Sequence, residues 1–181
     1  KLYFNLVNKT GTDSLHVLMY MYQKVFYKTN LAVLAAEPFT GMVPLTALPS
    51  GTMQLTVFDA NWKPVAERVA FINNNNFTIN AAINSKEIST QKRGKNTLEI
   101  LVADTIPANL SLSISDADMN GDMTSNTIVS DFLLKGDLKG YIHNPAFYFA
   151  NNSDATLKTK LDLVMLTHGW RRYNWADMLV Q

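Results

Sequence analysis

The residues that most resemble a metal site lie between positions 116 and 122. Oxygen-bearing side chains alternate there and a glycine stands at the sixth position, as in the first half of an EF-hand calcium loop: Asp116, Asp118, Asn120 and Asp122. The twelfth position of such a loop supplies a bidentate glutamate, but this chain has Thr127 there. The neighbouring residues also predict a strand and a polar stretch instead of two helices. The pattern therefore favours an acidic loop over a calcium site, and we expect no metal and no cofactor.

A second candidate site is the aromatic and basic stretch at residues 168–175. Its possible ligand contacts are Trp170, Arg171, Arg172, Tyr173 and Trp175. Aromatic rings beside guanidinium groups can stack on a glycan or hold a peptide. The alternative is structural: the tryptophans pack on the fold, and the arginines lie at the edge with their heads in water. We favour the structural interpretation and expect Trp170 to be a buried anchor.

Composition and motifs argue against several classes of function. The three histidines are far apart in the sequence, no cysteine is present, and no nucleophile elbow, zinc-protease helix or phosphate-binding loop occurs. We therefore expect that the chain is not an enzyme. The net charge of +1 implies neither a nucleic-acid nor a membrane-surface partner. The basic run at residues 92–95 has no interleaved aromatic residues, which is typical of a solvated turn.

The elements that would position these residues are mostly strands. Residues 52–72 predict a β-hairpin, because two apolar runs flank the turn-forming residues 59–64. Met53, Leu55 and Val57 alternate with Gln54, Thr56 and Phe58, which predicts a first strand with one buried face. Residues 2–7, 15–22, 25–34 and 42–47 predict further strands, with a turn at 23–24 and a break at 38–41. The stretch 15–22 alternates strongly, with Leu15, Val17, Met19 and Met21 on one face. Short strands at this spacing are typical of an immunoglobulin-like sandwich.

The second half of the chain has a different pattern. Residues 77–83 predict a strand, and residues 97–103 and 109–115 predict a hairpin in which Leu110, Leu112 and Ile114 face inward. Residues 128–134 have helical spacing. Ser153 or Asp154 can cap a second helix, whose apolar stripe is Leu157, Leu161, Val164 and Met165 and which ends near Gly169.

The four consecutive asparagines at residues 73–76 are the predicted domain boundary. The predicted fold class is mainly β, with two β-sandwich domains at residues 1–75 and 76–181, the second carrying one or two short helices near its C-terminal end. Because the chain starts at Lys1 and residues 1–7 lack a signal-peptide core, we expect a processed piece of a longer polypeptide. No apolar run reaches the ~18 residues of a membrane span.

Five segments resemble a known family. Residues 48–59 and 64–71 resemble the closing strands of a macroglobulin-type domain, residues 110–116 resemble a strand of the domain that follows it, and residues 137–145 with 161–173 resemble its C-terminal end. This order is similar to TonB-dependent receptor-like, or plug-domain, cell-envelope proteins of Bacteroidetes. The resemblance implies macroglobulin-type, immunoglobulin-like domains without chemistry of their own. No plug or barrel segment is present in this sequence, so a transport role would come only from the context.

Two functions follow as hypotheses. The first is a spacer or docking module of an outer-membrane protein, exported to the periplasm or outer membrane of a Gram-negative bacterium. Its partners would be other domains of the same longer chain or envelope proteins. The second is a module that binds glycan or peptide through the aromatic and arginine residues at 170–175 or in a cleft between the two predicted domains.

Overall fold

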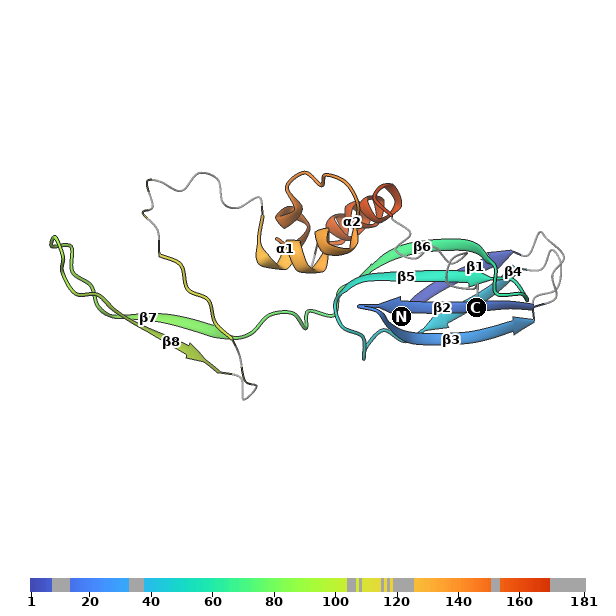
Figure 1. Ribbon diagram of the computed structural model, residues 1–181, viewed down its shortest axis with the longest axis horizontal. Coiled ribbons are helices and arrows are strands. Elements are labelled where there is room, and N and C mark those ends of the chain that lie inside the picture. Colours follow the sequence, from blue (N-terminus) through green and yellow to red (C-terminus); the bar gives the residue numbers. More distant parts are fainter. Residues whose placement is uncertain are drawn as a thin grey trace. The chain divides into compact units, whose positions relative to one another are not determined.

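A computed structural model describes residues 1–7, 14–32, 38–103, 107, 109–114, 116, 118, 126–150 and 154–169 (Figure 1). The described chain is mainly β, with antiparallel sheets and two short α-helices near its C-terminal end. It divides into two compact units. Unit 1 combines Lys1–Asn76 with Asp122–Gln181, and unit 2 is Phe77–Gly121.

The strands of unit 1 form two antiparallel sheets. The larger sheet has four strands in the order β3-β2-β5-β6: Lys24–Ala32, Ser14–Met21, Gly51–Phe58 and Pro64–Ile72. The smaller sheet pairs β1 (Leu2–Val7) with β4 (Pro38–Val43). The position of β4 corrects the sequence prediction of a break at residues 38–41. Pro38 is tolerated because it is the first residue of the strand, where a missing N–H does least harm.

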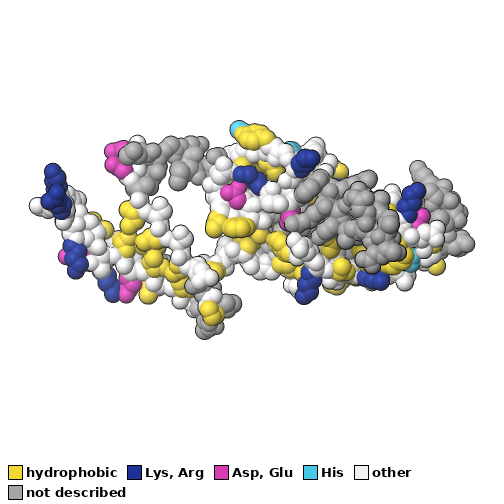
Figure 2. Space-filling view, in the orientation of Figure 1, with side chains coloured by type: hydrophobic (Ala, Val, Ile, Leu, Met, Phe, Trp, Pro, Cys, Tyr) yellow, Lys and Arg dark blue, Asp and Glu magenta, His cyan; other side chains and the backbone are white. Residues whose placement is uncertain are grey.

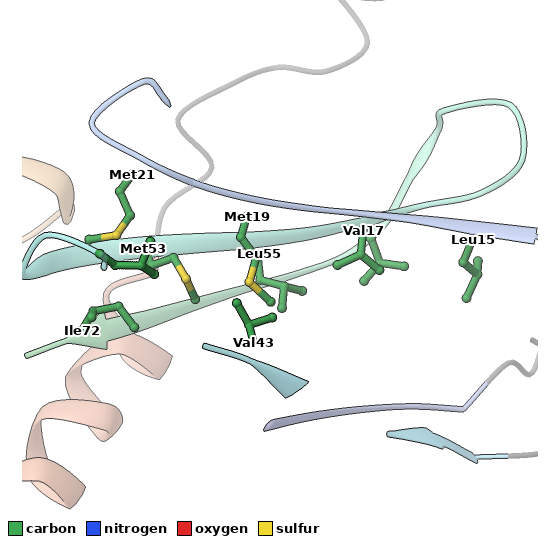
Figure 3. Close-up of a cluster of buried hydrophobic side chains, with 10 residues drawn as sticks. Leu15, Val17, Met19, Met21, Val43, Met53, Leu55 and Ile72 are labelled. Carbon is green, nitrogen blue, oxygen red and sulfur yellow. The ribbon is translucent and has the colours of Figure 1, made fainter. Parts of the chain in front are cut away.

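One hydrophobic core joins the two sheets. Leu15, Val17, Met19 and Met21 of β2 are all buried, which confirms the predicted alternation of this strand. Val43 of β4 belongs to the same cluster (Figure 3). The other buried members come from β5, β6 and the turn before β5: Leu48, Met53, Leu55, Val57 and Ile72. The inward residues of β1 are only partly buried against this core.

The central hairpin β5–β6 confirms the prediction for residues 52–72. The Asp59 carboxylate closes its turn by accepting hydrogen bonds from the backbone N–H groups of Asn61 and Lys63, both at 2.9 Å. The prediction that β5 has one buried face was wrong, because all eight of its residues are buried. The cause is tertiary. The outward Thr52 hydroxyl donates to the Leu133 carbonyl oxygen at 3.1 Å, so the helical segment covers this end of the face. Farther along, Gln54 and Thr56 donate to the Glu67 carboxylate at 3.1 and 3.2 Å.

The helical segment contains two capped α-helices. Thr127 and Ser130 form a reciprocal capping box at the start of α1 (Ile128–Leu133). The Asp154 carboxylate caps α2 (Ala155–Thr167) by accepting from the Thr156 backbone N–H at 2.7 Å, as the sequence predicted. Two 3-10 helices, η2 (Lys135–Asp137) and η3 (Pro145–Phe149), lie between α1 and α2.

Helix α2 packs on the larger sheet of unit 1. The predicted apolar stripe of α2 is buried, as expected, and three of its residues form a cluster with Val69 of β6. The other members of this cluster come from the helical segment itself: Leu134, Leu138 and Ile142. The domain prediction had placed these helices with residues 76 onward, whereas they pack with β6 of unit 1. The apolar outer side of β6 is the surface on which α2 buries its stripe. Because β6 and α2 are far apart in the sequence, the sequence pattern did not predict this contact.

Unit 2 is a hairpin of β7 (Ala81–Glu87) and β8 (Thr97–Val102). The predicted pairing of residues 97–103 with 109–115 was wrong, because β8 pairs with β7. Residues 109–114 carry no strand, and Leu110, Leu112 and Ile114 are exposed instead of facing inward. The loop between the strands sets this pairing: Asn96 Oδ1 accepts from the Ser89 backbone N–H at 2.8 Å, which brings the two strand ends together.

Candidate functional site

The structure describes only part of the acidic candidate site. Asp116 and Asp118 are exposed, and the Asp116 carboxylate accepts a hydrogen bond from the Asp118 backbone N–H at 3.0 Å, which is a local turn contact. Asn120 and Asp122 lie outside the described residues. Within the described ranges, no group of three or more His, Cys, Asp or Glu side chains is arranged to hold a metal ion.

The aromatic and arginine candidate site lies wholly outside the described residues. This holds for Trp170, Arg171, Arg172, Tyr173 and Trp175, so the buried Trp170 and the binding platform both stay predictions. The described helices include none that is long and apolar enough to cross a membrane.

The asparagine run has a structural role that the sequence did not reveal. The Asn74 side-chain amide donates to the carbonyl oxygens of Leu45 and Leu48 at 2.6 and 2.8 Å. Asn76 Oδ1 accepts from both the backbone N–H and the hydroxyl of Ser50, at 2.9 and 2.7 Å. These amides form hydrogen bonds with backbone groups of the turn before β5. The asparagine run therefore packs as part of unit 1, whose first segment ends at Asn76.

The same turn positions Tyr22, whose pKa is raised. Its hydroxyl donates to the Ser50 carbonyl oxygen at 2.6 Å. Burial, and then the negative charge of Asp137, raise the pKa of Tyr22 above its ordinary value of 10.0, because both disfavour the phenolate. The effect is structural: Tyr22 ties the β2–β3 turn, where Tyr22 and Gln23 both have positive φ, to the start of β5. The sequence had predicted this turn one residue later.

An aromatic cluster that the sequence did not predict covers the β5–β6 turn. The rings of Trp62 and His16 stack with centroids 4.2 Å apart and planes 5° apart. Lys28 Nζ lies 4.9 Å from the centroid of the Trp62 ring, and Phe58 lies 5.6 Å from it. This cluster depends on the pairing of β2 with β5, which places His16 opposite Phe58 next to the turn. The sequence alone does not give this pairing, so it could not predict the cluster.

A groove with a volume of about 490 Å³ lies along β1 in unit 1. One wall is the length of β1 from Leu2 to Leu6, and the opposite wall includes Ala66 and Ala70 of β6. Met53, Leu55 and Val57 of β5 also line it. The groove exists because the smaller sheet has two strands and the larger has four, so at ~4.8 Å per strand the smaller sheet covers about half of the larger.

Arg68 of β6 lies in the wall of this groove. Its Nη2 donates to both carboxylate oxygens of Asp162 on α2, at 2.8 and 2.9 Å. Its Nη1 is buried and has no hydrogen-bond partner among the described residues.

The hairpin of unit 2 exposes its apolar side chains. Cross-strand pairing of Ile83 with Ile100, Ala81 with Val102 and Ser85 with Leu98 places a mostly aliphatic row on one face. Ile83 is 61% exposed, and no residue of unit 2 that the structure describes is buried. Figure 2 shows hydrophobic side chains spread along β7 and β8. The other face carries the cross-strand pair of Ala82 with the exposed Leu101, then Asn84 and an ion pair between Lys86 Nζ and Glu99 Oε1 at 2.6 Å.

Comparison with known proteins identifies no relative. No known protein family, no curated protein and no solved structure matches the chain.

Proposed function

We propose that the chain is a non-catalytic docking module whose contact surface is the aliphatic face of the unit 2 hairpin. The observation that carries this proposal is the exposure of that face. An isolated two-stranded hairpin is at best marginally stable in water, and a contiguous apolar surface of this kind is typical of an interaction site. The hairpin gains a core only when a partner surface covers Ile83, Leu98 and Ile100.

Unit 1 has the properties of a rigid support in this proposal. Its two sheets share one core, and α2 adds a second cluster on the outer side of β6. Stability in unit 1 therefore does not depend on the residues that would make contact in unit 2. A chain with one well-packed unit and one exposed hairpin suits a module that docks through the hairpin and performs no chemistry.

The cellular setting of the proposal comes from the sequence resemblance. The segments at 48–59, 64–71, 110–116, 137–145 and 161–173 support a macroglobulin-type, immunoglobulin-like module of a TonB-dependent receptor-like protein of Bacteroidetes. In this setting the module is exported to the periplasm or outer membrane. The partner of the hairpin is then another domain of the same polypeptide or another envelope protein.

Site-specific photo-crosslinking in the bacterial host tests the proposal. A photoreactive phenylalanine analogue replaces Ile83 in one protein and Asn84, which points to the opposite face, in the matched control. We expect a discrete crosslinked product with an envelope component from position 83 and a much weaker one from position 84. Equal crosslinking from both positions, or none from position 83, would contradict docking through the aliphatic face.

A further inference from the structure

The hairpin of unit 2 carries more basic than acidic side chains, and the excess lies in the loop between its strands. The two carboxylates of β7 and β8 each have a basic partner: Glu99 Oε1 lies 2.6 Å from Lys86 Nζ, and Glu87 Oε2 lies 3.5 Å from Lys95 Nζ. The other two basic residues of the loop, at positions 92 and 93, have no compensating charge on the strands. A surface that docks against the hairpin therefore meets a positive charge at one end.

Lys92 and Arg93 form this basic tip of the hairpin. Both residues are exposed, and neither forms an ion pair with a residue that the structure describes. Figure 2 shows basic side chains at the loop end of the hairpin, beyond the hydrophobic side chains of the strands. At the opposite end of the hairpin, the cross-strand pair of Ala81 with Val102 carries no charge. The charge is thus polarised along the hairpin.

Hydrogen bonds within the loop hold the backbone of the basic tip. The Gln91 backbone N–H donates to the Ser89 hydroxyl at 3.2 Å, and the Gly94 N–H donates to the Gln91 carbonyl oxygen at 2.8 Å. Gly94 permits this close turn, because a Cβ at its position would overlap the Ser89 hydroxyl. Arg93 has a φ of 62°, in the left-handed region that residues with long side chains seldom adopt. A loop fixed in this way loses little backbone freedom when it binds, which favours association.

We propose that the partner surface of the hairpin has two parts: an apolar strip that covers the aliphatic face, and a cluster of carboxylates that contacts the basic tip. This inference rests on the proposed docking function and adds to it the chemistry and the orientation of the partner. The carboxylates lie beyond the end of the strip that covers Ser85 and Leu98, because this pair of the aliphatic face is nearest the loop. They form charge-assisted hydrogen bonds with Lys92 and Arg93.

A protein surface fits this charge distribution better than an anionic lipid surface. An element that lies on an anionic membrane carries basic residues along its whole polar face. Here the one basic residue on the face opposite the aliphatic row is Lys86, among the described residues of the strands, and Glu99 neutralises it. The uncompensated charge is confined to one end of the hairpin. Carboxylates gathered at one point beside an apolar strip match this arrangement, whereas a uniform layer of headgroups does not.

The test uses the whole chain with the photoreactive phenylalanine analogue at position 83 and the washed envelope fraction of the bacterial host. The charge reversal Lys92→Glu/Arg93→Glu should lower the yield of the crosslinked product at least about fivefold. The exchange Lys92→Arg/Arg93→Lys keeps both charges and should leave the yield within about twofold of wild type. Lys63→Glu/Lys139→Glu reverses two exposed lysines of unit 1 and is the matched control for net charge, with the same expected result.

Two further measurements report the contact of the basic tip itself. Raising sodium chloride from about 0.05 M to about 0.5 M screens charge pairs but not apolar contacts, so the wild-type yield should fall several-fold while that of the reversed variant changes little. A water-soluble carbodiimide links a lysine side chain to a carboxylate that it contacts. Mass spectrometry should therefore find Lys92 linked to an Asp or Glu residue of the same component that position 83 crosslinks.

The outcomes separate this inference from the docking function. Absence of a crosslinked product from position 83 in the wild type would contradict the docking function and the acidic partner together. A product whose yield is unchanged by reversal of the tip, or lowered equally by the unit 1 control, would overturn the acidic partner alone. Flotation of the purified chain with phosphatidylglycerol vesicles, but not with phosphatidylcholine vesicles, would overturn it in favour of lipid headgroups. If circular dichroism shows that the reversal unfolds the hairpin, Lys92→Gln/Arg93→Gln replaces it, and an unchanged yield would again overturn the acidic partner.

Discussion

Replacing Leu161 of α2 tests the packing of this helix on β6. Leu161 is 6% exposed and lies in the cluster that contains Val69 and Met165. Leu161→Ala removes three carbon atoms from this cluster, which at ~0.8 kcal/mol per buried CH₂ gives about 2.4 kcal/mol of lost transfer free energy. The cavity left behind adds to this, so we expect a loss of about 3 kcal/mol in the free energy of unfolding, within the ~2–5 kcal/mol typical of such changes.

The matched control is Leu163→Ala on the same helix. Leu163 is 56% exposed, so the same chemical change should alter stability by less than about 0.5 kcal/mol. Urea denaturation followed by far-ultraviolet circular dichroism gives both values, since the helix signal reports α2 directly. Equal midpoints for Leu161→Ala and Leu163→Ala would refute the burial of the α2 stripe.

A double-mutant cycle identifies the surface that α2 covers. Leu161→Ala and Val69→Ala should couple by about 0.5–3 kcal/mol if the two side chains share one cluster. Additive effects within error would mean that α2 is stabilised by contacts other than those with β6.

Three further predictions concern single contacts of unit 1. Gly41→Ala should destabilise by about 1–3 kcal/mol in thermal or urea unfolding, because the added Cβ would overlap the Phe4 ring, and Phe4→Leu in the same chain should restore part of the loss. Asn74→Ala should lower the free energy of unfolding by about 1–3 kcal/mol, because two side-chain hydrogen bonds to part-buried carbonyl oxygens are lost, although the Leu45 oxygen keeps the Leu48 N–H and the Leu48 oxygen keeps the Asn76 amide; an unchanged urea midpoint would show that Asn74 does not hold the turn. Hydrogen bonds from the Thr156 hydroxyl and backbone N–H lower the pKa of Asp154 below its ordinary value of 3.8, so its contribution is present at neutral pH and is lost as pH falls through the folded-state pKa. Melting temperatures between about pH 5 and pH 2 should therefore fall less steeply for Asp154→Asn, and identical slopes would contradict this cap.

The local elements were predictable because their causes are local. The alternation of β2, the turn chemistry of Asp59, the cap at Asp154 and the stripe of α2 all depend on residues within a few positions of one another. The sequence predicted a docking module as a class of function, but it did not indicate the exposed hairpin face that we propose for contact. The sequence assigned Leu110, Leu112 and Ile114 to a buried face, and the structure exposes them.

The tertiary structure decided which surfaces are covered and which stay open. Burial of both faces of β5, the packing of α2 on β6 and the fastening of Asn74 to the turn before β5 all join residues distant in sequence, for which neither periodicity nor propensity carries a signal. The groove beside β1 arises from the difference in width between two sheets, which is a property of strand order alone. The sequence by itself therefore determined the alternation of β2, the central hairpin turn and the cap of α2, because short-range sterics and hydrogen bonds select them. Only the assembled sheets determined the candidate sites, because a site requires surfaces brought together across the chain.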